Sequence, residues 1–328
     1  MPVLIIGSGL VGSQAARLEV ERGERPVILE LNPQPEALGE IVDLNQVSIV
    51  PGDVLRPLDL AAVIRREGIT HILHTAANTL LTEGAQRNPY AAVELNIMGT
   101  LNVLEAARLF GIQRVVLSSS AVLYSSMAPA LDPAGGLTEE ALPRPGTFYA
   151  TTKQALEGLG INYAQTFGLD VRMVRYAAVF GPWRGRGGGG GPTQRFRELV
   201  ERGLRGEDAT FPALPPGIEF VYSKDAARGT VLACHAEGLK SRVFNIGMGA
   251  TQTSESIAEA FRGVVPGARV ALQGGITTTA AGPATPARDA AMDRRRAEAE
   301  LGYRAQYDLR SAFEDYVQFY RERGATRS

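Results

Sequence analysis

The fold is indicated most clearly by the N-terminal segment VLIIGSGLVGSQAARLEVERGERPVILE, residues 3–30. It opens with the short apolar run Val3–Ile6 and continues into Gly7-Ser8-Gly9-Leu10-Val11-Gly12. Apolar residues then recur at near-helical spacing up to Gly23, and a second apolar run, Val27–Leu31, carries Glu30 near its end. This order predicts a strand, a glycine turn, a helix and a second strand.

The glycine turn has the spacing that binds a phosphate group. Gly7 permits the tight turn, Gly9 lets a pyrophosphate approach the backbone, and Gly12 lets the helix pack closely on the sheet. The N–H groups at the start of the helix then face the phosphates. Glu30 follows Gly12 by 18 residues, where a carboxylate can accept hydrogen bonds from both hydroxyls of an adenosine ribose. The stretch therefore predicts dinucleotide binding, with NAD as the cofactor.

The rest of the first half repeats the alternation of strand and helix. Short apolar runs without polar alternation occur at Val47–Val50, Ile69–Leu73, Val115–Leu117 and Val171–Val179. Helical patterns cover Leu58–Glu67, Pro89–Phe110 and Tyr149–Phe167. Strands that are apolar on both faces and alternate with helices predict an α/β fold of the Rossmann type, a doubly wound parallel sheet.

The second half of the chain is less regular. Gly187–Gly191 is a run of five glycines, and Pro212–Gly217 and Gly274–Ala287 lack periodicity. Such loops are either lids or linkers. We expect a NAD-binding domain over residues 1–180, with a returning segment at about 218–250. Residues 181–217 and 251–328 then form a smaller substrate-binding lobe.

Composition excludes several classes of function. A formal net charge of −1 leaves no broad basic field for nucleic acid or an anionic membrane. No apolar stretch reaches the roughly 18 residues needed to span a bilayer, and no secretory signal is expected. One cysteine, Cys234, and three histidines make neither a disulfide nor the usual zinc cage, so we expect no metal and a reducing, cytoplasmic setting.

Two side chains with paired chemistry lie four residues apart in Tyr149-Ala150-Thr151-Thr152-Lys153, and so share one face of a helix. A phenol is a weak base at neutral pH, but Lys153 and a nicotinamide cation would lower its pKa. Tyr149 could then take the proton of a substrate alcohol while hydride leaves for the nicotinamide. Ser118-Ser119-Ser120 ends a strand at the sheet edge where such folds bind ligands. By itself the Tyr and Lys pair is also typical of an ordinary exposed helix.

The chain resembles the extended short-chain dehydrogenase/reductases, of the NAD-dependent epimerase/dehydratase branch. The resemblance rests on the glycine turn and Glu30, then Gly52-Asp53-Val54, His74-Thr75-Ala76-Ala77, Asn96 to Ala106, Ser118 to Tyr124, Tyr149 to Lys153, Arg175-Tyr176, Gly181-Pro182, Phe220-Val221-Tyr222 with Asp225, Phe244-Asn245-Ile246-Gly247 and Leu301-Gly302-Tyr303. It covers essentially the whole chain.

The resemblance implies that Tyr149 and Lys153 are catalytic and that Ser120 is the catalytic serine. It places Asp53 and Val54 beside the adenine, and Ala76 and Ala77 beside the cofactor. We also expect His74 to form part of the cofactor wall. Turn and resemblance together give a cofactor site of Gly7, Gly9, Leu10, Val11, Gly12, Glu30, Asp53, Val54, Ala76, Ala77, Asn96, Ser118, Tyr149, Lys153 and Tyr176.

Several positions depart from the family pattern. Gly7-Ser8-Gly9 shortens the first glycine spacing, which changes the turn but keeps access for phosphate. Ala178 stands where the sugar-nucleotide enzymes commonly have Asn, and Ile218-Glu219 replaces a common Arg-Asp. Loss of an arginine that grips a diphosphate weakens the case for a sugar-nucleotide substrate. Ser120, Ala178, Arg184 and Arg186 are the candidate substrate contacts, although the two arginines also fit a mobile basic loop.

These features predict an NAD-dependent oxidoreductase acting on a secondary alcohol of a carbohydrate-like substrate. One alternative is an NDP-sugar epimerase, similar to UDP-glucose 4-epimerase, with tightly bound NAD. Another is a non-catalytic NAD-binding sensor or scaffold. We also expect a homodimer, because the apolar positions of the helices at 89–110 and 149–167 exceed what one sheet face absorbs; they include Leu95, Leu104, Leu156 and Leu159.

Overall fold

The computed structural model describes residues 1–79, 88–124, 136–143, 145–186, 192–214, 218–273 and 290–324. Its centre is a seven-stranded sheet in which all neighbouring strands run parallel. In spatial order the strands are β10 (Val243–Ile246), β6 (Val171–Tyr176), β5 (Arg114–Ser120), β4 (His71–His74), β1 (Val3–Ile6), β2 (Val27–Glu30) and β3 (Ser48–Pro51). The predicted parallel sheet is confirmed, and the glycine turn follows β1, an inner strand next to the central β4.

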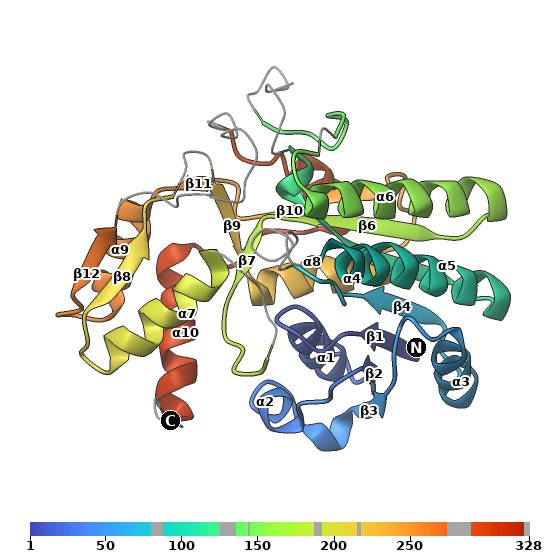
Figure 1. Ribbon diagram of the computed structural model, residues 1–328, viewed down its shortest axis with the longest axis horizontal. Helices are drawn as coiled ribbons and strands as arrows, with labels where there is room; N and C mark the ends of the chain where they lie inside the picture. Colours follow the sequence, from blue (N-terminus) through green and yellow to red (C-terminus); the bar gives the residue numbers. More distant parts are fainter. Residues whose placement is uncertain are drawn as a thin grey trace.

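Helices cover both faces of this sheet (Figure 1). Val3 and Ile5 of β1 pack in one apolar core with α1 (Gly12–Glu21) and α8 (Ser223–His235). Leu4 and Ile6 face the other way, into a second core formed with α3 (Pro57–Glu67), α5 (Gly99–Phe110) and α6 (Phe148–Phe167). Alternate residues of one strand therefore enter separate cores, as a sheet buried on both faces requires.

The predicted helix at 89–110 is divided into three parts. α4 (Pro89–Val93) is followed by a π-helical turn, Glu94–Met98, and then by α5. The turn holds Asn96, whose buried side chain accepts a hydrogen bond from the Asn78 backbone at 2.8 Å and donates one to Thr152 Oγ1 at 3.1 Å. These hydrogen bonds satisfy the amide group of Asn96, which is buried in an otherwise largely apolar helical segment. Short helical segments also occur at α2 (Pro35–Gly39), Leu44–Gln46 and Ala121–Tyr124.

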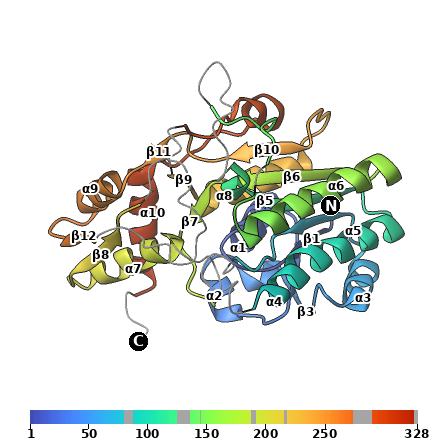
Figure 2. The same cartoon turned by 45° about the horizontal axis from the view of Figure 1, so that its top comes forward.

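The second lobe lies beside the carboxyl edge of the sheet (Figures 1 and 2). It contains the small sheet β11 (Thr251–Gln252), β9 (Ile218–Tyr222) and β7 (Ala178–Phe180), the pair β12 (Val270–Gln273) and β8 (Ala209–Pro212), and the helices α7 (Pro192–Leu204), α9 (Ser254–Val264) and α10 (Leu309–Glu322). Its core is aromatic: Phe180 stacks on Phe196 with ring centroids 4.2 Å apart. The predicted strand Val171–Val179 therefore divides at residue 177, between two sheets.

Two predicted domain boundaries differ from the structure. β9, at the start of the predicted returning segment, pairs within the second lobe, whereas α8 and β10 do return to the first. Residues 290–303, expected in the second lobe, also pack on the first, where Met292, Leu301 and Tyr303 join the core of β1. The Asn245 side chain fixes this segment by donating to the Asp293 carbonyl at 3.1 Å. The predicted loops Gly187–Gly191 and Gly274–Ala287 lie outside the described residues.

Candidate active site

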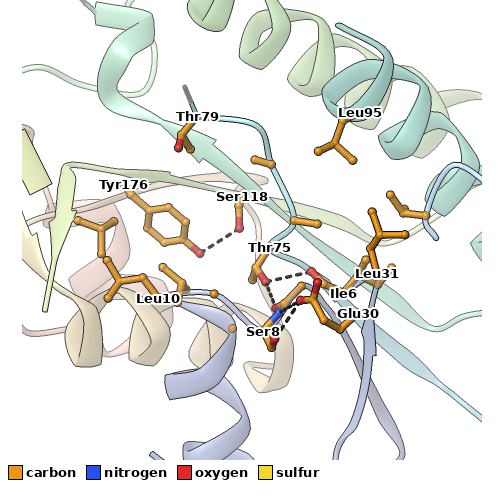
Figure 3. Close-up of a pocket in the computed structure, with 18 of the residues that line it drawn as sticks. Ile6, Ser8, Leu10, Glu30, Leu31, Thr75, Thr79, Leu95, Ser118 and Tyr176 are labelled. Carbon is orange, nitrogen blue, oxygen red and sulfur yellow. Dashed lines mark hydrogen bonds between the residues drawn. The ribbon is translucent and has the colours of Figure 1, made fainter. Parts of the chain in front are cut away.

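A cavity of about 520 Å³ opens at the carboxyl ends of β1, β2, β4, β5 and β6. Figure 3 shows its lining, with Ser8 and Glu30 at one end and Tyr176 and Ser118 at the other. This is the edge at which open α/β sheets bind ligands. Of the predicted cofactor residues, it brings together Gly7, Gly9, Leu10, Val11, Gly12, Glu30, Asp53, Val54, Ala76, Ala77, Ser118, Tyr149, Lys153 and Tyr176.

The glycine turn forms a cradle that side chains would fill. Gly7 has φ +93°, in the left-handed region that favours glycine. A Cβ on Gly12 would lie 1.9 Å from the Gly7 carbonyl oxygen, so the helix approaches the turn as closely as the backbone allows. A Cβ on Gly9 would meet nothing within 4 Å, which leaves the cavity side of the turn open. This space and the helix start beside it fit a pyrophosphate.

Two hydrogen-bonding side chains hold the turn. Thr75 Oγ1 donates to the Ile6 carbonyl at 3.0 Å and to the Gly7 carbonyl at 2.8 Å (Figure 3). The Glu30 carboxylate accepts from the Ser8 backbone N–H at 2.8 Å and from the Ser8 hydroxyl at 2.9 Å. Glu30 is therefore oriented at the cavity end where an adenosine ribose fits. Ser8 and Thr75 were not predicted as site residues, although both lie within quoted motifs, Gly7 to Gly12 and His74-Thr75-Ala76-Ala77.

The three predicted catalytic side chains line the same cavity. Ser120, at the end of β5, is hydrogen bonded to the Tyr149 side chain at the start of α6. One turn further along α6, the Lys153 ammonium donates to the Ser118 carbonyl at 2.6 Å. The strand end and the helix start thus bring a hydroxyl, a phenol and an ammonium to one wall.

Burial controls the acid–base properties of this wall. It raises the pKa of Tyr149 to about 12, against the opposing effect of the Ser120 hydrogen bond. It also lowers the pKa of Lys153 to about 8, partly offset by the negative charge of Glu157. In the chain by itself the net shift of the Tyr149 pKa is therefore upward, whereas the lowering that the sequence predicts also involves the nicotinamide cation of a bound cofactor. The reason is that burial dominates, and the Lys153 ammonium, 5.6 Å from the Tyr149 ring centroid, points to a carbonyl.

Three predicted residues lie elsewhere. Asn96 lies behind the cavity, joined to Asn78 and Thr152. His74, predicted as part of the cofactor wall, is fully buried outside the cavity lining, and burial lowers its pKa to about 3, so it is neutral. Arg184 lies over the Tyr320 ring and 3.5 Å from Glu40, beside a second cavity of about 510 Å³.

Arg186 and Ala178 do line the main cavity. The Arg186 carbonyl accepts from the Gln34 side chain at 3.1 Å, and its N–H donates to the same amide. This contact joins residues 152 positions apart, so no local sequence signal could have identified Gln34.

Two further classes of site find no support in the part of the chain that the structure describes. There, no group of three or more His, Cys, Asp or Glu side chains is arranged to hold a metal ion. None of the helices described has the length and apolar character that crossing a bilayer requires. Cys234 is buried, which raises the pKa of its thiol.

Comparison with known proteins gives consistent relationships. The model of the NAD dependent epimerase/dehydratase family matches residues 3–247. A UDP-glucose 4-epimerase from Corynebacterium glutamicum is 27% identical over 324 residues, covering 94% of this chain and 92% of that protein. A UDP-glucuronate 4-epimerase from Thermodesulfobacterium geofontis is 28% identical over 193 residues, which cover 58% of this chain and 55% of that protein. The solved GalE-like L-threonine dehydrogenase from Cupriavidus necator, in its holo form, is 28% identical, with a TM-score of 0.81 over 97% of this chain and 99% of that one.

Proposed function

Because the chain belongs to the NAD dependent epimerase/dehydratase family, we propose that it transfers hydride between NAD and a secondary alcohol of a carbohydrate-like substrate: a sugar, a sugar acid or a polyol. The observation that carries this proposal is that Ser120, Tyr149 and Lys153 share one cavity with the glycine turn. A bound NAD supplies the hydride acceptor that the chain itself lacks.

Each of the three side chains has a distinct part in this chemistry. Tyr149 takes the proton from the substrate hydroxyl, and returns it in the reverse direction. Ser120, already hydrogen bonded to Tyr149, orients the reacting oxygen. Lys153 holds the nicotinamide ribose and stabilises the phenolate of Tyr149 by its charge.

A sugar-nucleotide epimerase is the second candidate, and the names of two relatives favour it. Such a substrate brings a diphosphate, which needs cationic partners. Among the described residues that line the cavity, the cationic side chains are Lys153 and Arg186. Glu219, at a position where a common pattern has Asp, instead accepts from the Gly249 and Met292 N–H groups at 2.6 and 2.7 Å. We therefore favour a substrate without a nucleotide.

One experiment distinguishes the proposed oxidoreductase, the epimerase and the non-catalytic scaffold from one another. Purified protein is assayed for bound NAD, and NADH absorbance is followed with a panel of sugars, sugar acids, polyols and L-threonine. UDP-glucose and UDP-glucuronate are tested for epimerised product. An exchangeable cofactor with NADH formed from a free alcohol supports the proposal, whereas retained NAD with epimerised product supports the second candidate. Binding of NAD without turnover on any substrate would favour the scaffold.

Glu30 predicts a preference for NAD over NADP. A carboxylate held at the ribose edge by Ser8 repels a 2′-phosphate, so we expect NAD to bind at least about tenfold more tightly, ~1.4 kcal/mol. Calorimetric titration of both cofactors measures this ratio, and Glu30→Gln should reduce it. Equal or tighter binding of NADP to the unmodified protein would contradict the assignment.

We also propose a homodimer formed through α4, α5 and α6. Leu104 and Leu156, which the sequence suggested for this contact, are instead buried in the core. Other apolar side chains of these helices, and of the π-helical turn between α4 and α5, are exposed: Tyr90, Val93, Met98, Leu109, Phe148 and Phe167. Figure 2 shows the three helices side by side on one flank of the molecule. A surface of this kind marks an interface.

Light scattering at micromolar protein should therefore give twice the chain mass of 35.0 kDa. Met98→Glu should shift the mass toward the monomer, because it places a charge in the contact. Leu58→Glu, on α3 and 81% exposed, is the matched control and should leave the dimer intact. A monomeric mass for the unmodified protein would exclude this proposal.

The proposed cellular setting of the protein is the cytoplasm, where the single cysteine stays reduced.

A further inference from the structure

Three consecutive serines at the end of β5 contact three residues of α6 that lie four positions apart. Ser120 is hydrogen bonded to Tyr149, and the Ser118 carbonyl accepts from Lys153 at 2.6 Å. The Ser119 hydroxyl donates to Glu157 Oε1 at 2.5 Å. Residues four apart lie on one helical face, so Glu157 continues the line that the two catalytic residues begin.

Glu157 is an ionic group buried beneath the active site. Its side chain is 6% exposed and that of its partner, Arg175 on β6, is 4% exposed. Arg175 donates from Nε to Glu157 Oε1 at 2.8 Å and from Nη2 to Oε2 at 2.7 Å. The pair is therefore bidentate and links α6 to both β5 and β6.

A hydrogen-bonded chain extends from this pair across the sheet. Arg175 Nη1 donates to the Tyr124 hydroxyl at 2.8 Å, and Tyr124 donates to Asn245 Oδ1 at 2.7 Å. The Asn245 N–H donates to Glu139 Oε1 at 2.8 Å. Strands β5, β6 and β10 are thus joined to the carboxylate of Glu157 by buried contacts, each of which restricts its position.

The charges around Lys153 give Glu157 a second effect. On β4, His74 is neutral, and on β5 the Ser118 carbonyl accepts from the ammonium. Tyr149 and Glu157 approach from α6 itself, and on β6 Arg175 lies against Glu157, while Tyr176 lines the same cavity. Burial lowers the pKa of Lys153 and Glu157 raises it. Among the described groups, Glu157 is thus the carboxylate that favours the charged lysine.

We propose that Glu157 is a positioning residue for the reaction: held by Ser119 and Arg175, it seats α6 on the end of β5 and keeps Lys153 charged. The inference rests on the proposed function, in which a charged Lys153 supports the phenolate of Tyr149. A buried ion pair is an inefficient way to gain stability, since well-packed apolar residues serve as well or better. Its placement beside the catalytic residues is what a role in the reaction explains.

The sequence offers a direct test, because the chain has three lysines, Lys153, Lys224 and Lys240. Protein labelled with 13C at lysine Cε gives three side-chain signals whose shifts report deprotonation, and Lys153→Met identifies the signal of Lys153. Titration of the full chain then measures the pKa of Lys153 without any need for turnover. Glu157→Gln keeps the shape and removes the charge.

In Glu157→Gln we expect the pKa of Lys153 to fall by roughly half a unit or more, as loss of a nearby opposite charge requires. The alkaline limb of the pH–rate profile for alcohol oxidation should move to lower pH by a similar amount. Glu157→Asp, which keeps the charge, should restore most of the Lys153 titration. Lys224 and Lys240 are internal controls and should titrate as in the unmodified protein.

Asp170→Asn is the matched control for a purely structural effect. Asp170 pairs with Arg114 at 2.8 Å, at the opposite end of β5 from the serines. We expect this variant to lower the melting temperature while leaving the Lys153 titration and the pH–rate profile unchanged. If Glu157→Gln fails to fold, the double variant Glu157→Gln, Arg175→Gln leaves no unpaired buried charge and is titrated in its place.

A Lys153 pKa unchanged in Glu157→Gln, or in the double variant, would overturn the inference. An equal fall of the Lys153 pKa in Asp170→Asn and in Glu157→Gln would also overturn the inference, because the fall would then reflect a general loss of stability. A missing substrate would leave the titration unaffected, so failure of the proposed function is distinguishable from failure of this inference.

Discussion

Replacing Tyr149 by Phe should abolish most turnover while leaving the fold and NAD affinity nearly unchanged. The substitution removes only the hydroxyl that exchanges a proton with the substrate, and the ring keeps its place on the cavity wall. General acid–base catalysis of this kind contributes about 10² to 10⁴ in rate, or roughly 3 to 5 kcal/mol of barrier. The measurement is kcat for oxidation of the alcohol at saturating NAD, alongside the Kd of NAD.

Tyr163→Phe is the matched control on the same helix. The Tyr163 hydroxyl donates to Glu105 Oε1 at 2.5 Å, away from the cavity, so its loss should leave kcat within about twofold. If Tyr149→Phe turns over at a near wild-type rate with the same NAD affinity, the Tyr and Lys pair has no part in the chemistry. The base must then be sought among other residues.

The pH dependence of this step should depend on Lys153. Burial raises the pKa of Tyr149 to about 12 with Lys153 in place, so the phenolate requires the positive charges of Lys153 and of the nicotinamide together to form nearer neutral pH. In Lys153→Met one of these two charges is absent, and the rise of the oxidation rate with pH should move to higher pH. A profile unchanged in this variant would show that Lys153 does not support the phenolate.

Gly12→Ala should have the second large effect, on folding and on cofactor binding together. The new Cβ would lie 1.9 Å from the Gly7 carbonyl oxygen and 2.8 Å from Thr75 Oγ1, so either the turn or α1 must move. Overpacking of this kind costs about 1 to 3 kcal/mol, which corresponds to a fall in Tm of roughly 5 °C. Since the displaced groups form the phosphate cradle, NAD affinity should fall by about tenfold or more.

Two other glycines separate these effects. Gly9→Ala meets no atom within 4 Å, so it should keep the Tm but weaken NAD binding by occupying the space above the turn. Gly263 lies near the end of α9, and a Cβ there would also meet nothing within 4 Å. Gly263→Ala should therefore leave NAD affinity unchanged and shift the Tm by no more than a few degrees. Unchanged NAD affinity in both Gly12→Ala and Gly9→Ala would contradict the assignment of the turn.

Much of the site could be predicted because its residues belong to short motifs. In a parallel sheet, whatever follows each strand reaches the same edge, so Gly7, Asp53, Ala76 and Ser118 had to converge once the strands were recognised. Asn96, predicted for the cofactor site, and Arg184, predicted for the substrate site, do not line the cavity, for a common reason. Each belongs to a segment near the site, but the direction of a side chain depends on the packing of the segment.

The parallel sheet, the glycine turn and the helix that carries Tyr149 and Lys153 follow from the amino-acid sequence, because they depend on local periodicity and on glycine's backbone freedom. What surrounds these elements depends on how the whole chain packs. The Gln34 contact with Arg186, the return of residues 290–303 to the first core, and the burial of Glu157 against Arg175 all join distant segments. The pKa values of Tyr149 and Lys153 also depend on tertiary packing, since the desolvation of a side chain depends on every group that packs around it.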